Sequence, residues 1–85
     1  MEANGLTAVP EALFSALPAL THLDLRSNQI MAIPGTIGQH RQLQTLLLAN
    51  NLISALPVEL GNVRTITALS LSDNPLYFPE VHHFF

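Results

Sequence analysis

The chain has 85 residues with a formal net charge of −3, and only 11% of its residues are charged. This length allows one domain but not two, and a hydrophobic content of 48% is too high for a disordered segment. Three arginines, no lysine and six acidic residues do not supply the basic surface that a nucleic-acid-binding protein needs. We therefore expect no nucleic-acid partner.

The absence of cysteine excludes disulfides, zinc–thiolate sites and a cysteine nucleophile. The first residues lack the basic and apolar regions of a signal peptide. No apolar run approaches the roughly 18 residues that are needed to cross a bilayer. These features predict a cytoplasmic protein that does not interact with a membrane.

The chain divides into four units, a partial first repeat of residues 1–19 and the repeats 20–42, 43–65 and 66–85. In each later unit, an apolar-x-x-apolar-x-apolar triplet precedes an asparagine. The asparagines recur at intervals of 24, 23 and 23 residues, so the chain is built from internal repeats. The asparagines are Asn4, Asn28, Asn51 and Asn74, and the triplets are Leu20, Leu23, Leu25; Leu43, Leu46, Leu48; and Ile66, Leu69, Leu71.

Each triplet predicts a short strand, because alternate side chains of a strand point to opposite faces. The leucines then face a shared core, and stacking the units gives three parallel strands. Pro10, Pro34 and Pro57 each fix φ and prevent a strand. Short helical or irregular connections are therefore predicted within residues 11–17, 35–41 and 58–64.

The asparagines stand where the chain leaves each strand and turns over the core. An asparagine amide supplies both donors and an acceptor, so it can bond buried backbone groups that would otherwise be unpaired. A structural ladder of Asn28, Asn51 and Asn74 is therefore predicted.

The pattern resembles the leucine-rich repeat family, whose core is Leu-x-x-Leu-x-Leu-x-x-Asn-x-Leu. Residues 33–38 and 56–61 match the continuation Leu-Pro-x-x-Ile-Gly of the 23-residue class, which is found mostly in intracellular proteins. The resemblance implies a right-handed α/β solenoid with a short parallel β-sheet on its concave face and short helical or irregular convex segments. Neither end has a recognisable polar cap, so we expect a fragment or a short isoform of a longer array.

The outward strand positions lie six, four and two residues before each asparagine, and they are the candidate partner-binding residues. Leu47 is the candidate contact anchor, because a large exposed apolar group can mark an interface. The alternative is a solvated sheet face without a ligand, since single exposed leucines are common. Asp24 and Arg26 are interpreted as a surface ion pair rather than a recognition element. The full set is His22, Asp24, Arg26, Thr45, Leu47, Ala49, Ala68, Ser70 and Ser72.

Catalytic and metal sites are not indicated. His22 and Asp24 have no nucleophile or phosphate-binding loop beside them, and the adjacent pair His82 and His83 lacks the spacing of a fixed metal site. His40 is interpreted as a partly buried structural residue that bonds the backbone. We expect no enzyme activity, no cofactor and no bound metal.

The repeat pattern favours a protein-interaction module that binds an unidentified partner protein through the concave sheet face. Two alternatives remain open. One is a structural spacer or self-association unit that stacks through its uncapped ends, and the other is a regulatory module of a larger signalling protein.

Overall fold

Each leucine triplet of the sequence contains one three-residue strand. The computed structural model describes residues 5–76, and it has the strands β1 (His22–Asp24), β2 (Thr45–Leu47) and β3 (Ala68–Ser70). They form one parallel sheet in the order β1-β2-β3. His22 pairs with Thr45 and Thr45 with Ala68, so equivalent positions of successive repeats lie side by side.

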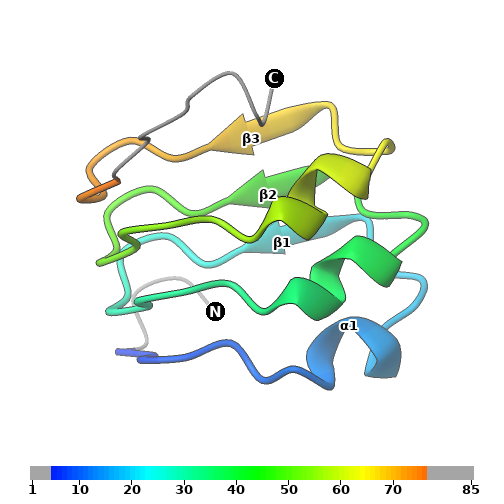
Figure 1. Ribbon diagram of the computed structural model, residues 1–85, viewed down its shortest axis with the longest axis horizontal. Coiled ribbons are helices and arrows are strands. Elements are labelled where there is room, and N and C mark those ends of the chain that lie inside the picture. Colours follow the sequence, from blue (N-terminus) through cyan, green and yellow to red (C-terminus); the bar gives the residue numbers. More distant parts are fainter. Residues whose placement is uncertain (1–4, 77–85) are drawn as a thin grey trace.

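The second layer consists of the connections that precede the strands (Figure 1). It contains the helix α1 (Leu13–Ala16) and the two 3₁₀ helices η1 (Gly35–Gln39) and η2 (Val58–Asn62). All three lie inside the predicted connecting segments. Figure 1 shows them stacked in front of the sheet, one per repeat. The predicted α/β solenoid, with a parallel sheet and short helical segments, is confirmed.

Proline sets where the 3₁₀ helices begin. Pro34 and Pro57 directly precede η1 and η2, both with φ of −69° and extended ψ. This φ is the value that the proline ring imposes, and a proline just before the first turn removes no helical hydrogen bond. The helices are too short to be stable alone, so packing holds them in place.

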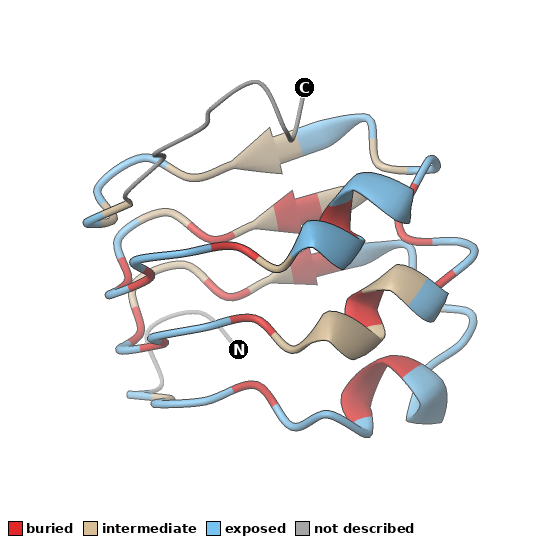
Figure 2. Cartoon of the chain, viewed as in Figure 1, coloured by how far each residue is buried: buried red, intermediate tan, exposed pale blue. Residues whose placement is uncertain are grey.

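The core lies between the two layers (Figure 2). It is built from the inward strand leucines, the apolar residues that follow the asparagines, two apolar residues of α1 and one each of η1 and η2. The most deeply buried members are Leu25, Ile30, Ile37, Leu43, Leu46, Leu48 and Ile53. The most deeply buried part of the interior therefore comes from residues 20–42 and 43–65.

The asparagines bond the backbone inside the turns. The Asn51 amide donates to the carbonyls of Leu25 at 2.9 Å and Leu48 at 3.0 Å, and its Oδ1 accepts from the Ile30 N–H at 3.1 Å. Asn74 repeats this arrangement one repeat further along, bonding Ile53 N–H and the Leu48 carbonyl. Each ladder residue thus joins its own turn to the preceding one.

A residue with left-handed backbone stands before each ladder asparagine. Ser27, Asn50 and Asp73 have φ values of 60°, 59° and 58°. Polar residues of this kind tolerate positive φ better than branched apolar ones. Asn4, His82 and His83, which entered the sequence predictions, lie outside the described residues.

Candidate functional site

The outer face of the sheet carries the nine candidate residues in three rows. The first row is His22, Thr45 and Ala68, and the second is Asp24, Leu47 and Ser70. Backbone bonds continue beyond the strands, since Ser27 N–H donates to the Ala49 carbonyl at 3.0 Å and Asn50 N–H to the Ser72 carbonyl at 2.9 Å. The third row is Arg26, Ala49 and Ser72.

We call these nine residues the outer face. His22, Ala68 and Ser72 are exposed, and the other six are intermediate in exposure. On the strands, the intervening leucines Leu23 and Leu46 are buried, so the alternation predicted from the sequence places the outer face opposite the core.

Leu47 lies at the centre of this face, between Asp24 on β1 and Ser70 on β3. Strand alternation predicted an exposed side chain at this position, but Leu47 is only partly exposed. Neighbouring strands lie about 4.8 Å apart, so the side chains on either side cover part of the leucine. A substitution here therefore removes some packing as well as a surface contact.

Asp24 and Arg26 form the predicted ion pair. Arg26 Nη2 lies 2.7 Å from Asp24 Oδ2, and Arg26 Nε lies 2.9 Å from Oδ1. The hydrogen bonds from the guanidinium are the main reason that the pKa of Asp24 falls from 3.8 to about 2. Two parallel bonds hold the guanidinium in a fixed orientation. Because the pair is partly exposed, it contributes little to stability, but it presents an ordered charged group beside Leu47.

The remaining side chains of the outer face are small or neutral. Short side chains surround Leu47 on the side of β3, so the leucine projects further from the sheet than they do. They are Ala68 and Ser70 on β3 and Ala49 and Ser72 beyond the strands. The face therefore changes from charged at β1, through apolar at β2, to small and neutral at β3. Such a surface can bind a partner by shape and by burial of its apolar centre.

His40 is structural, as the sequence analysis expected, but it is fully buried, with 4% of its surface exposed. Its Nδ1 accepts the N–H groups of Gln42 at 3.2 Å and Leu43 at 3.0 Å. Nε2 lies 3.0 Å from the Leu17 carbonyl and must donate to it. Both ring nitrogens therefore bond backbone groups.

The part of the chain that the structure describes contains no group of three metal-ligating side chains. Over the same residues, no helix has the length and hydropathy to span a membrane.

Comparison with known proteins agrees with this architecture. The sequence model described as "Leucine rich repeat" matches residues 1–53. A chain from the crystal structure of the BIR3–SERK2 complex of Arabidopsis thaliana is 33% identical, with a TM-score of 0.80 over 89% of this chain and 42% of that one. A leucine-rich repeat protein of Leptospira interrogans is 35% identical, with a TM-score of 0.77 over 81% of this chain and 17% of that protein. The chain thus spans less than half the length of either structure.

Proposed function

Because the chain belongs to the leucine-rich repeat family, we propose that it binds a partner protein through its outer face and has no catalytic activity of its own. Repeat modules of this family generally mediate protein–protein interaction. One structure to which the chain is similar comes from a protein complex, which supports a protein as the class of partner. Fold alone does not identify a ligand, so the choice of surface depends on the site itself.

The row of Asp24, Leu47 and Ser70 is the observation that carries the proposal. A large apolar side chain stands at the centre of the sheet, with an ordered ion pair on one side and small side chains on the other. Binding energy at protein interfaces is concentrated in a few central residues surrounded by weaker contacts. We assign the central contact to Leu47 and the surrounding contacts to the other eight residues of the outer face.

The test compares Leu47→Asn with Val58→Asn. Asparagine removes the apolar contact without placing a second carboxylate beside Asp24. Val58 is the matched control, because it is an apolar residue of η2 with 72% of its surface exposed and lies in the layer opposite the outer face (Figure 1). Proteins captured from an extract of the source cells are quantified by mass spectrometry for each variant.

We expect Leu47→Asn to reduce the amount of captured partner at least about tenfold. Val58→Asn should capture as much partner as the unmodified chain. Melting curves of both variants are recorded first, so that loss of folding is not mistaken for loss of binding. Equal capture by the two folded variants, or loss in Val58→Asn alone, would contradict the proposal.

Self-association is the second candidate, and burial at the last strand favours it. Leu69 and Leu71 are only partly buried, whereas the equivalent Leu46 and Leu48 are 1% and 0% exposed. A further repeat or a second copy stacked on β3 would bury them. Sedimentation velocity distinguishes the candidates. The sedimentation coefficient of a self-associating chain increases with protein concentration, whereas that of a chain that binds only other proteins stays constant.

We also propose an intracellular location and a role as part of a longer protein, such as a regulatory module in signalling. The 23-residue repeat and the absence of cysteine support the location. Within the family, the stretches 46–48, 57–61 and 75–79 are similar to the vertebrate leucine-rich repeat-containing protein 27, and we propose that relationship as the finer assignment.

A further inference from the structure

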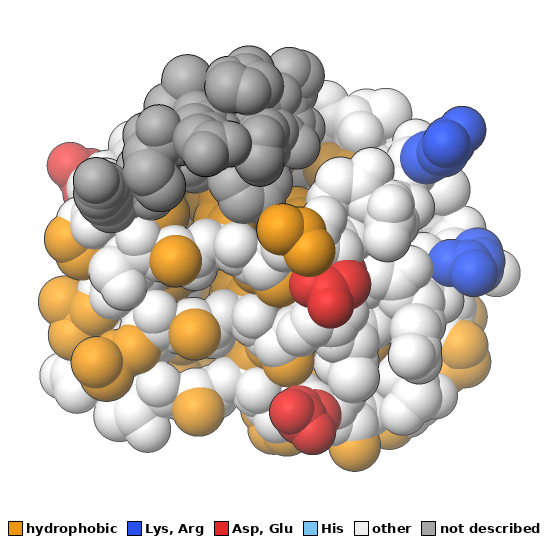
Figure 3. Space-filling model, viewed as in Figure 1, with side chains coloured by type: hydrophobic (Ala, Val, Ile, Leu, Met, Phe, Trp, Pro, Cys, Tyr) orange, Lys and Arg blue, Asp and Glu red, His pale blue; other side chains and the backbone are white. Residues whose placement is uncertain are grey.

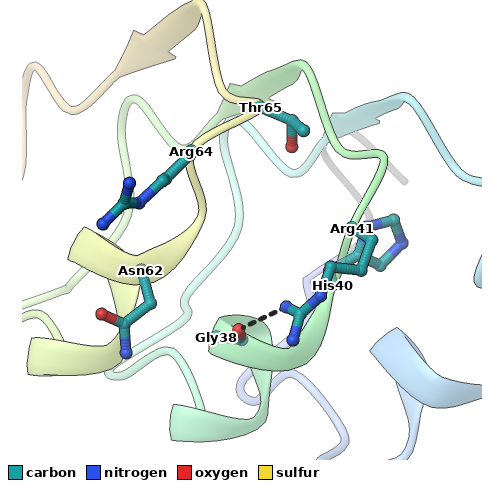
Figure 4. A pocket seen from close by; sticks show the side chains of 6 residues that line it. All are labelled: Gly38, His40, Arg41, Asn62, Arg64 and Thr65. Carbon is teal, nitrogen blue, oxygen red and sulfur yellow. Dashed lines mark hydrogen bonds between the residues drawn. The ribbon is translucent and has the colours of Figure 1, made fainter.

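Two of the three arginines lie in one hollow on the flank of the molecule, away from the outer face. The hollow has a volume of about 430 Å³ and is lined by Gly38, His40, Arg41, Asn62, Arg64 and Thr65. It lies where the chain passes from η1 and η2 to the sheet (Figure 4). Figure 3 shows two arginine side chains near each other at one edge of the surface.

The repeat places these two arginines together. Arg41 and Arg64 are 23 residues apart, and each stands two residues after the last residue of its 3₁₀ helix, η1 or η2. The third arginine, Arg26, is already bonded to Asp24 on the outer face. Within residues 5–76, the two arginines that are not in an ion pair therefore border the same hollow.

Among the described residues, neither arginine has an acidic partner. Arg41 Nη1 donates to the Gly38 carbonyl at 3.2 Å, which leaves its other donors available. Within residues 5–76, Arg64 forms no hydrogen bond or ion pair. Glu11 and Glu59 instead line a separate hollow on the other side of Gly38 and Asn62, so positive and negative side chains are segregated.

We propose that the hollow binds a phosphate monoester on a phosphorylated protein, with Arg41 and Arg64 as its two cationic contacts. A doubly charged phosphate would balance both guanidinium groups, and guanidinium and phosphate form paired hydrogen bonds. The lining adds a neutral donor, the Asn62 amide, and no carboxylate. The volume is at the lower end of the range for ligand sites, which suits a phosphorylated side chain.

The test uses NMR of the arginine side chains at pH 7.5 and constant ionic strength. The probes are inorganic phosphate, a capped glycine–phosphoserine–glycine peptide, and the same peptide with glutamate in place of phosphoserine. We expect saturable shifts of the Nε–Hε signals of Arg41 and Arg64 with both phosphate probes, and affinity for the phosphopeptide at least about fivefold above that for the glutamate peptide. Tighter binding of the phosphopeptide than of inorganic phosphate identifies a phosphorylated protein as the source.

Arg41→Gln and Arg64→Gln are each expected to weaken phosphopeptide binding at least about fivefold. Arg26→Gln removes the same charge elsewhere and is expected to leave binding unchanged, and backbone spectra verify that each variant is folded. The proposal is overturned if the folded Arg41 and Arg64 variants bind as the unmodified chain does, if Arg26→Gln weakens binding equally, or if the glutamate peptide or free phosphate binds as tightly as the phosphopeptide.

Discussion

The third repeat, residues 43–65, and the region of the last strand, β3, carry the same sequence pattern but are buried to different extents. In the third repeat, Leu46 and Leu48 are 1% and 0% exposed and Asn51 is 4% exposed. Their equivalents Leu69, Leu71 and Asn74 are all intermediate in exposure. The backbone conformation is nevertheless the same, because β2 and β3 pair in register and Asn50 and Asp73 share a positive φ.

This difference shows that local conformation comes from the repeat itself, whereas burial comes from the neighbouring repeats. The third repeat is packed on both sides by described strands, since β2 lies between β1 and β3. In repeat proteins, stability is close to a sum of terms for each repeat and each interface. One substitution should therefore have different effects at equivalent positions of the two regions.

The largest expected effect is that of Leu48→Asp. The new carboxylate would lie in the core without a cationic partner, and an uncompensated buried charge costs roughly 3–5 kcal/mol. A single small core rarely supplies more than about 3–5 kcal/mol in total, so we expect the variant to be unfolded by circular dichroism and NMR. Leu71→Asp, at the equivalent position beyond β3, should remain largely folded. Two equally folded variants would show that burial does not differ between the regions.

The next largest effect is expected for Asn51→Ala, which leaves buried backbone groups unpaired. It should lower the free energy of unfolding by an amount on the order of 1–3 kcal/mol. Asn74→Ala removes an equivalent set of bonds, but solvent reaches them, so its cost should be below about 1 kcal/mol. Urea denaturation measures both. A larger loss for Asn74→Ala would reverse the comparison.

Gly38→Ala and Gly61→Ala compare equivalent positions in η1 and η2. A Cβ on Gly38 would lie 2.8 Å from Glu59 Cβ and 3.1 Å from its carbonyl oxygen, whereas a Cβ on Gly61 meets nothing within 4 Å. Overpacking of this kind costs about 1–3 kcal/mol, and an unhindered surface change stays within about 0.5 kcal/mol. We expect the thermal midpoint to fall only in Gly38→Ala, and a similar fall in both variants would exclude the close contact as its cause.

The smallest effect concerns the ion pair on the outer face. The pKa of Asp24 is about 2 in the folded chain and 3.8 as its ordinary value. Because the folded value is the lower one, the stabilisation is complete above about pH 3.8 and is lost as the pH falls through about 2. In Arg26→Gln, NMR titration of the carboxyl group should give a pKa that returns toward 3.8. An unchanged value would mean that Arg26 is not the cause.

The sequence predicted the repeats, the strands and their register, because the 23-residue period fixes which positions pair. It also predicted the structural role of His40. The extent of burial was harder to predict. Leu47 is less exposed and His40 more buried than expected, since both depend on side chains from adjacent repeats.

The hollow between Arg41 and Arg64 was missed for a related reason. The low number of cations excluded a nucleic-acid partner, but this prediction took no account of where the arginines stand in the repeat. The 23-residue spacing of these two arginines was the signal that would have placed them side by side.

The most direct test of the comparison is hydrogen exchange of the side-chain amides of Asn51 and Asn74, measured by NMR on one unmodified sample. Each amide donates to three carbonyls, so the two groups differ mainly in burial. We predict that the Asn51 amide exchanges at least about tenfold more slowly, because it opens only when the surrounding repeats unfold. Equal exchange rates would contradict the claim that neighbouring repeats, and not the repeat sequence, determine how strongly each position is held.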